Sequence, residues 1–379
     1  METLRKFVGL LLDAPGVLAT NAAKLHRALG VASTPHSVVH QERTFRLLHF
    51  PPSPGKALGL AAAPPILFVP SLINRWYVLD LLPEHSTIRA LADRGHSIYV
   101  LAWEGANDGH GPLTLADWVS RYVDRAVRLT TQHAGVETIT VVGQCLGGTM
   151  ALAHAARFPA HVDRVIALTT PVDFTQGGLL GTWTSPEVVD AERLATTWPG
   201  VVPDDVVYGA FPLLNPRTLL TRHRTLLAMV ENDDFVRLYQ ALDLWTTEHL
   251  PVASGALRTL VADLYQQNAL WEGKWVVGDG PVRLEDIRCP VLAVYAKGDD
   301  IVPEASAAAL LDRIPQAQSF VSPAGHVTLV LGSPLRFQTW KAMHLFCLNT
   351  PPASSTPPAP SSPPQSSSPA RPPSKGPTA

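Results

Sequence analysis

The chain has 379 residues and a formal net charge of −2, and 46% of its residues are apolar against 16% charged. This composition is ample for the buried core of one large domain or two ordinary ones. The near-neutral charge offers no electrostatic case for binding nucleic acid or a strongly anionic surface. Three scattered cysteines are too few for a disulfide framework or a metal site, and a reducing cytoplasm fits them best.

The N-terminal segment, residues 1–37, is predicted to be helical and amphipathic. Its apolar side chains recur at i, i+4, i+7 and i+8 and therefore share one helix face: Leu4, Val8, Leu11 and Leu12. Basic residues before an apolar run also resemble a signal peptide, but Asp13 cuts that run short. No segment reaches the roughly 18 apolar residues that a transmembrane helix needs.

Short apolar runs alternate with helical patterns between residues 38 and 348. The apolar runs predict strands at 65–70, 97–103, 138–142, 165–170, 291–295 and 318–321. The helical patterns predict helices at 86–94, at 114–133 with Thr114 as the cap, and at 147–158. Fully apolar strands alternating with helices indicate an α/β protein whose mostly parallel sheet is covered on both faces.

Two regions depart from this alternation. Residues 175–284 are rich in Trp, Pro and Leu, and they predict an inserted, mainly helical cap over the sheet. The sheet domain is then formed by residues 38–174 and 285–348. Residues 349–379 are almost all Pro, Ser and Ala, and a segment with no apolar face to bury is predicted to be disordered.

A nucleophilic cysteine is predicted at Cys145, in the sequence Gly143-Gln-Cys-Leu-Gly147 between a strand and a helix. A strand, a G-x-C-x-G turn and a helix together form the nucleophile elbow of the α/β-hydrolase fold. The helix N-terminus behind the thiol favours the thiolate. The N–H of Leu146 can stabilise an oxyanion, and a second donor is expected at Leu72 or Ile73, with Ile73 as the candidate.

Such a nucleophile needs an acid and then a histidine later in the chain. Asp299 follows the strand at 291–295 and is the candidate acid, with Asp300 as its competitor. His326 follows the last predicted strand in a Gly-His loop and is the candidate base. The other two cysteines, Cys289 and Cys347, are interpreted as packing residues. No pattern in the sequence points to a cofactor or a metal.

At these residues the sequence resembles the poly(3-hydroxyalkanoate) synthases, especially their short two-subunit type. The resemblance covers roughly residues 30 to 330 and extends well beyond the elbow. It includes five further segments: Ile73–Asp80, Ser86–Arg89, Thr170–Phe174, Tyr265–Asn268 and Asp286–Leu292. Scattered matches of this kind are more specific than the elbow, which other cysteine hydrolases share.

The resemblance implies an acyltransferase that polymerises (R)-3-hydroxyacyl-CoA and releases CoA. Cys145 would carry the growing chain as a thioester, His326 would act as the base and Asp299 would orient it. An accessory subunit, the surface of a polymer granule and an oligomeric state are the implied partners, with a granule-associated place in the cytoplasm. A cap that excludes water would favour polymerisation over hydrolysis.

Two short motifs depart from the family pattern. The family usually has Asp-His-Ile-Val-Pro where this chain has Asp299-Asp300-Ile-Val-Pro303, and Gly-Gly-His-Ile-Gly where it has Ala324-Gly-His-Val-Thr328. Neither departure removes a member of the predicted triad. Two other functions remain as alternatives: a different cysteine hydrolase, such as a thioesterase or a dienelactone-hydrolase-like enzyme, and an inactive homologue on storage granules.

Overall fold

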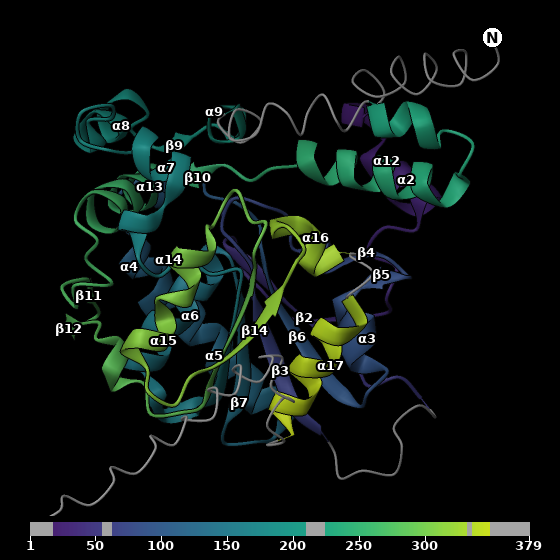
Figure 1. The fold of residues 1–379 in the computed structure, drawn as a ribbon, viewed down its shortest axis with the longest axis horizontal. Helices are drawn as coiled ribbons and strands as arrows, with labels where there is room; N and C mark the ends of the chain where they lie inside the picture. Colours follow the sequence, from purple (N-terminus) through teal and green to yellow (C-terminus); the bar gives the residue numbers. More distant parts are fainter. Residues whose placement is uncertain (1–17, 55–62, 210–223, 332–335, 349–379) are drawn as a thin grey trace, which may run out of the picture.

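The computed structural model describes residues 18–54, 63–209, 224–331 and 336–348 (Figure 1). The predicted apolar stripe from Leu4 to Leu12 and the predicted disordered tail at 349–379 lie outside these residues. Eight strands form the central sheet, in the order β1-β2-β6-β3-β7-β8-β13-β14. They are β1 (Ser37–Gln41), β2 (Phe45–Phe50), β3 (Ala63–Val69), β6 (His96–Trp103), β7 (Ile139–Gln144), β8 (Val162–Leu168), β13 (Val291–Ala296) and β14 (Gln318–Ser322).

The sheet is parallel from β6 to β14, and these six strands are the six that the sequence predicts. The two strands at the other edge were not predicted: β2 pairs antiparallel with both β1 and β6. β3 lies between β6 and β7, so the chain leaves β3 toward one side of the sheet and later returns to its other side. Such a switch point opens a crevice at the carboxyl ends of the strands.

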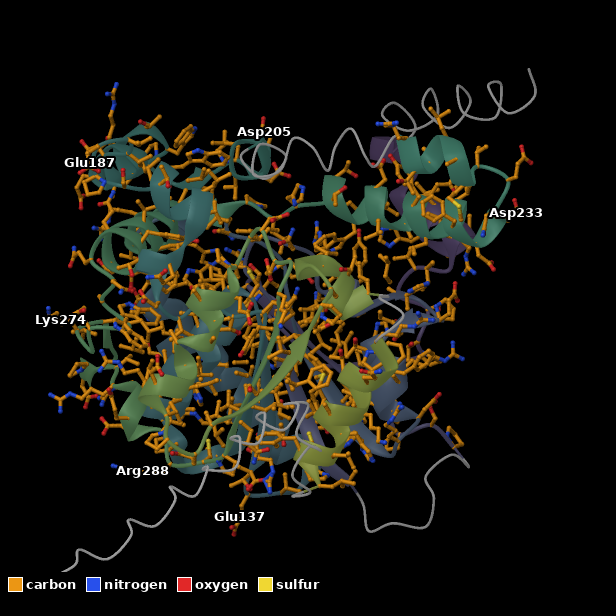
Figure 2. The ribbon with its side chains drawn as sticks, viewed as in Figure 1. Glu137, Glu187, Asp205, Asp233, Lys274 and Arg288 are labelled. Carbon is orange, nitrogen blue, oxygen red and sulfur yellow. The ribbon has the colours of Figure 1, made fainter. Side chains whose placement is uncertain are left out.

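Both faces of the sheet are buried, as the apolar strands predict. Along β3, Leu67 and Val69 belong to one core cluster, whereas Ile66 and Phe68 belong to the cluster on the opposite face. Glu137 is one of the charged side chains that lie at the periphery, at the lower end of the molecule in Figure 2. This arrangement confirms the predicted α/β class with a sheet covered on both sides.

Helices from separate parts of the chain provide the covering layers. One face is covered by α3 (Thr87–Ala92), α16 (His326–Leu331) and α17 (Arg336–Cys347), and the other by α5 (Asp124–Ala134), α6 (Leu146–Arg157), α14 (Glu304–Ala308) and α15 (Leu310–Arg313). The helix predicted at 114–133 is divided into α4 (Leu115–Asp117), a π-helical stretch at Trp118–Val123 and α5. Thr114 caps it as predicted, because its hydroxyl accepts the N–H of Asp117.

The described part of residues 175–284 is mainly helical. Its helices are α7 (Gly178–Trp183), α8 (Ala191–Thr197), α9 (Asp204–Gly209), α12 (Asp233–Thr247), α13 (Ser254–Thr259) and a π-helical stretch at Leu260–Gln266. Short strand pairs accompany them and the adjoining chain: β4 (Asp80–Leu82) with β5 (His85–Ser86), β9 (Val201–Val202) with β10 (Val252–Ala253), and β11 (Val276–Val277) with β12 (Gly280–Pro281). Figure 1 shows α7, α8, α9 and α12 above the upper end of the sheet.

The described N-terminal helix α2 (Leu18–Leu29) lies against α12 (Figure 1). His26 of α2 lies 3.1 Å from both carboxylate oxygens of Glu248, just after α12. The hydroxyl of Tyr77 donates a 2.7 Å hydrogen bond to the same carboxylate. The helix α2 is therefore joined to the end of α12 and to the chain that follows β3.

Candidate active site

Cys145 lies at a sharp turn between the end of β7 and the start of α6. Its backbone has φ 54° and ψ −127°, a region that a residue with a side chain enters at a cost on the order of 1–3 kcal/mol. Two backbone hydrogen bonds of 2.8 Å hold it there: its N–H donates to the carbonyl of Leu168 on β8, and its carbonyl accepts the N–H of Gly148. The sequence prediction of a nucleophile elbow therefore has the expected backbone geometry.

Close approach of backbones explains the glycines around this cysteine. A Cβ atom on Gly147 would lie 2.0 Å from the carbonyl oxygen of Val69 on β3. A Cβ atom on Gly143 would lie 2.4 Å from the Cα atom of Gly148. Any larger residue would push α6 away from the strands and would displace the thiol with it.

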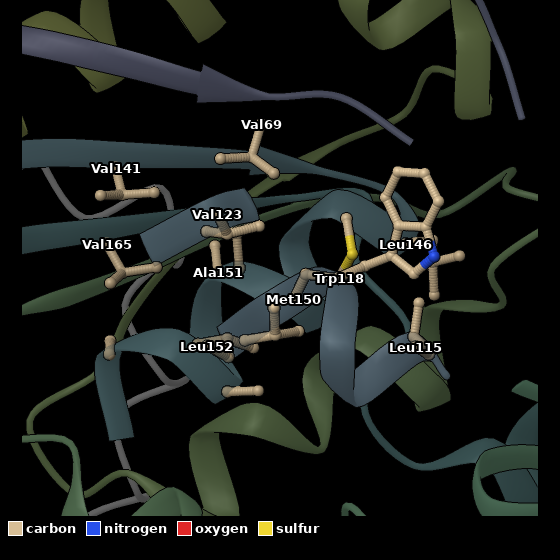
Figure 3. Packing of buried hydrophobic residues seen from close by; sticks show 14 of the residues in the cluster. Val69, Leu115, Trp118, Val123, Val141, Leu146, Met150, Ala151, Leu152 and Val165 are labelled. Carbon is tan, nitrogen blue, oxygen red and sulfur yellow. The ribbon is translucent and has the colours of Figure 1, made fainter. Parts of the chain in front are cut away.

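The packing around α6 keeps the elbow in place. Met150 and Leu146 of α6 lie in one core cluster with Trp118, and Val141 of the sheet belongs to the same cluster (Figure 3). The indole of Trp118 is 2% exposed, and Met150 is fully buried. The strained turn is therefore anchored by buried contacts on the helix that follows it.

Asp299 and His326 meet beside this turn. Asp299 follows β13, His326 is the first residue of α16 after β14, and their side chains are 1% and 9% exposed. Nδ1 of His326 lies 2.7 Å from Oδ2 of Asp299. This bond leaves Nε2 of the imidazole for the thiol of Cys145, with which His326 also forms a hydrogen bond. The three candidate residues are therefore brought together in the order thiol, imidazole, carboxylate.

The structure also distinguishes the two neighbouring aspartates. Oδ1 of Asp299 accepts the backbone N–H groups of Ile301 at 2.9 Å and Val302 at 2.8 Å, so this carboxylate is fixed by three hydrogen bonds in all. Asp300 has an exposed side chain. Of the two candidates, Asp299 is the one that contacts His326.

The environment of His326 favours its protonated form. Burial alone would lower the pKa of His326, but the adjacent charge of Cys145 and the hydrogen bonds to Asp299 and Cys145 more than offset it. Together these influences raise the pKa of His326 from its ordinary 6.5 to about 10. The site therefore favours an imidazolium at His326 beside Cys145 in the absence of substrate.

The raised pKa of His326 predicts a titration that depends on Cys145. The stabilisation from a raised pKa is complete below pH 6.5 and is lost as the pH rises through about 10. In Cys145→Ala, the charge and the hydrogen bond from the thiol are both absent, so the pKa of His326 should fall well below 10. Titration of the His326 ring by ¹⁵N NMR in the two proteins measures this shift. Identical titrations would show that Cys145 does not raise the pKa of His326.

The two predicted oxyanion donors come from the ends of two neighbouring strands, β7 and β3. Leu146 is the first residue of α6, so its N–H belongs to the first turn, which has no partner within the helix. Ile73 lies in the loop after β3, where its carbonyl accepts the N–H of Leu250 from the cap at 3.1 Å. Beside it, the indole N–H of Trp245 donates to the carbonyl of Arg75 at 2.9 Å. Leu250 and Trp245 thus hold the loop that carries the second candidate donor.

One residue near the thiol was not assigned a role from the sequence. The ring of Tyr265 packs edge-on against Phe174 at 5.0 Å, and burial together with the charge of Cys145 raises the pKa of its hydroxyl. Asn268 fixes this wall of the site, because its Oδ1 accepts the N–H of Phe174 at 2.9 Å and its Nδ2 donates to Asp173 at 2.8 Å. These residues lie in Thr170–Phe174 and Tyr265–Asn268, two of the segments that resemble the synthase family. That resemblance was the one sequence feature that could have pointed to them.

The other cysteines have different surroundings. Burial raises the pKa of Cys289 to about 11 and that of Cys347 to about 12, so both thiols stay protonated at neutral pH. Within the described ranges, no group of three or more His, Cys, Asp or Glu side chains is arranged to hold a metal ion. Among the helices that the structure describes, none is long and apolar enough to cross a membrane.

The class of protein follows from the sheet, the cysteine elbow and the acid and histidine loops. The alpha/beta hydrolase fold family matches residues 64–333. The sheet also resembles the crystal structure of a candidate lipase from Acinetobacter baumannii AYE, with a TM-score of 0.52 and 14% identity over 87% of this chain and 97% of that one. This chain is thus an α/β-hydrolase-fold protein, as predicted.

Sequence relatives narrow the class to one family. The family described as poly-beta-hydroxybutyrate polymerase (PhaC) N-terminus matches residues 12–91. The chain is 32% identical to a poly(3-hydroxyalkanoate) polymerase subunit PhaC of Synechocystis sp. over 308 residues, which is 78% of this chain and 80% of the relative. It is 29% identical to the corresponding subunit of Haloferax mediterranei over 86% of this chain and 66%, just under two thirds, of that relative. The chain belongs to the family of PhaC polymerase subunits.

Proposed function

We propose that this protein polymerises (R)-3-hydroxyacyl-CoA into poly(3-hydroxyalkanoate) through a thioester on Cys145. The observation that carries the proposal is the hydrogen-bonded series from Cys145 through His326 to Asp299 in a member of the PhaC family. A thiolate attacks a thioester carbonyl readily, and exchange of one thioester for another is nearly balanced in free energy. The enzyme therefore has to position and activate its thiol without driving the exchange uphill.

In the first half of the cycle, the thiolate of Cys145 attacks the carbonyl carbon of the acyl-CoA. The negative charge on the carbonyl oxygen is stabilised by the N–H groups of Leu146 and Ile73. The carbon–sulfur bond to CoA then breaks, and the imidazolium of His326 gives its proton to the departing CoA thiolate. This leaves an acyl group on Cys145 and a neutral imidazole ready to act as a base.

In the second half, His326 takes the proton of the 3-hydroxyl of a further hydroxyacyl-CoA. The alkoxide oxygen attacks the Cys145 thioester, an ester bond forms, and the thiol leaves with the proton that His326 returns. Attack of Cys145 on the lengthened CoA thioester then releases the next CoA, so each added unit releases one CoA. Asp299 holds the imidazole in the tautomer that presents Nε2 to these groups.

Polymerisation requires that water does not replace the 3-hydroxyl as the attacking group. The partly buried Tyr265 and the buried Phe174 form an aromatic wall near the thiol, and the cap segment around Trp245 covers the loop after β3. An apolar surrounding of this kind excludes water from the acyl thioester. We assign the water-excluding role to residues 175–284, which form the cap in the domain arrangement that we propose.

The same family relationship supports the proposed partners. An accessory subunit agrees with the naming of the relatives as polymerase subunits. An oligomer of this chain and attachment to polymer granules in the cytoplasm complete the proposal. A purified chain that works with an accessory subunit should polymerise slowly, after a lag, when that subunit is absent.

Incubation with 3-hydroxybutyryl-CoA tests the function directly. Released CoA is followed by its free thiol, and polymer by turbidity. A polymerase should release CoA while turbidity rises, and no stoichiometric soluble 3-hydroxybutyrate should form. CoA release with soluble acid alone would identify a thioesterase, and no release under any condition would identify an inactive homologue.

A further inference from the structure

A departure from the family motif lies directly after the candidate base. The chain has Thr328 where the family's Gly-Gly-His-Ile-Gly ends in glycine. The backbone N–H of Gly325 donates a 2.9 Å hydrogen bond to Oγ1 of Thr328. The same hydroxyl donates a 3.2 Å hydrogen bond to the carbonyl of Gly325. A side chain that glycine cannot supply is therefore bonded to the residue just before His326.

The position of this bond in the helix gives it a consequence. α16 begins at His326, and the N–H of Leu329 donates to the carbonyl of Gly325 at 3.0 Å, so Gly325 is the residue that caps the helix. A bond from the third helical side chain back to the cap's N–H is one half of a capping box. It fixes the backbone of a glycine, the residue with the largest conformational freedom.

The loop on the other side of Gly325 is held by separate bonds. The N–H of Ala324 donates to Oγ of Ser322 at 3.2 Å, and the carbonyl of Ala324 accepts the N–H of Gly298 at 3.3 Å. Gly298 immediately precedes Asp299, so these bonds join the histidine loop to the acid loop. On the helix side, Gly325 is held by its hydrogen bond to the hydroxyl of Thr328.

We propose that Thr328 is a positioning residue for His326. By fixing Gly325, its hydroxyl sets the direction of the first residue of α16 and so holds the imidazole between Asp299 and Cys145. The chemical importance of this direction rests on the proposed function, in which His326 activates the thiol. The geometric part of the inference concerns the thiol–imidazole pair and holds for any chemistry at Cys145.

Thr328→Val removes the hydroxyl and keeps the shape of the side chain, whereas Thr328→Ser keeps the hydroxyl. Loss of one such hydrogen bond should lower kcat and the rate of Cys145 alkylation by iodoacetamide at pH 7 by about tenfold in the valine variant. KM should stay unchanged, and the pH profile of alkylation should change because the imidazolium of His326 is no longer held toward Cys145. The serine variant should stay within about twofold of the parent protein in both rates.

Thr196→Val is the matched control. Thr196 is also an exposed helical threonine, and its hydroxyl donates to the carbonyl of Arg193 at 3.0 Å, but it lies in α8 of the cap. The control should change neither rate. Equal rates in Thr328→Val and the parent protein, or equal losses in the valine and serine variants, would overturn the proposal. Because alkylation needs no CoA substrate, it tests Thr328 even if no variant forms polymer.

Discussion

Cys145→Ala should abolish release of CoA from 3-hydroxybutyryl-CoA, with a loss of at least about a thousandfold. Without the thiol no covalent intermediate can form, and the remaining groups of a catalytic triad contribute little on their own. Cys145→Ser should fail almost as completely, because a hydroxyl is a poorer nucleophile and leaving group in thioester exchange. The measurement is the initial rate of thiol release under saturating substrate.

The chain supplies a control for this substitution. Cys347 is a buried thiol that also loses its sulfur on replacement by alanine, but its raised pKa keeps it protonated and it belongs to the core cluster on the opposite face of the sheet from Leu146. Cys347→Ala should lower the melting temperature, as truncation in a core does, and should keep its activity. Substantial turnover by Cys145→Ala, with Cys347→Ala equally active, would falsify the assignment of the nucleophile.

The parallel part of the sheet was predictable because its strands are continuous apolar runs. β7 and β13 are buried along their whole length, and burial on both faces leaves a signal that needs no knowledge of the partner strands. β1 was not predicted, because its residues are exposed or only partly buried and alternate weakly. Its pairing with β2 depends on long-range contacts that local patterns do not encode.

The candidate triad was also predictable in part, because local patterns identified its residues but not the contacts between their side chains. Order along the chain and position after a strand pointed to Cys145, Asp299 and His326, because the fold places the ends of parallel strands at one edge. Those signals favoured Asp299 but left Asp300 as a competitor, because the two differ in the direction of their side chains. The role that we propose for Thr328 could not be predicted from the sequence either, because its hydroxyl acts only through the bond to Gly325.

The two aspartates therefore provide the second large expected effect. Asp299→Asn should lower kcat on the order of a thousandfold, because the amide can still accept the backbone N–H groups at Oδ1 but turns a donor toward His326. The ring must then flip its tautomer, and the proton on Nε2 faces the thiol that it should activate. The pKa of His326 should also fall, since the hydrogen bond and the charge of Asp299 help to raise it.

Asp300→Asn is the matched control, with the same chemical change one residue away. Its side chain is exposed, and the carboxylate bonded to His326 is that of Asp299. Substitutions at exposed positions usually change the free energy of unfolding by about 0.5 kcal/mol or less, so kcat should stay within about twofold. Comparing kcat for the two variants, together with the ¹⁵N titration of His326, separates loss of the orienting carboxylate from a general loss of negative charge in the loop. If Asp300→Asn were the inactive variant, the acid loop would have to shift by one residue during catalysis, and the 2.7 Å contact between Asp299 and His326 would belong to a resting arrangement.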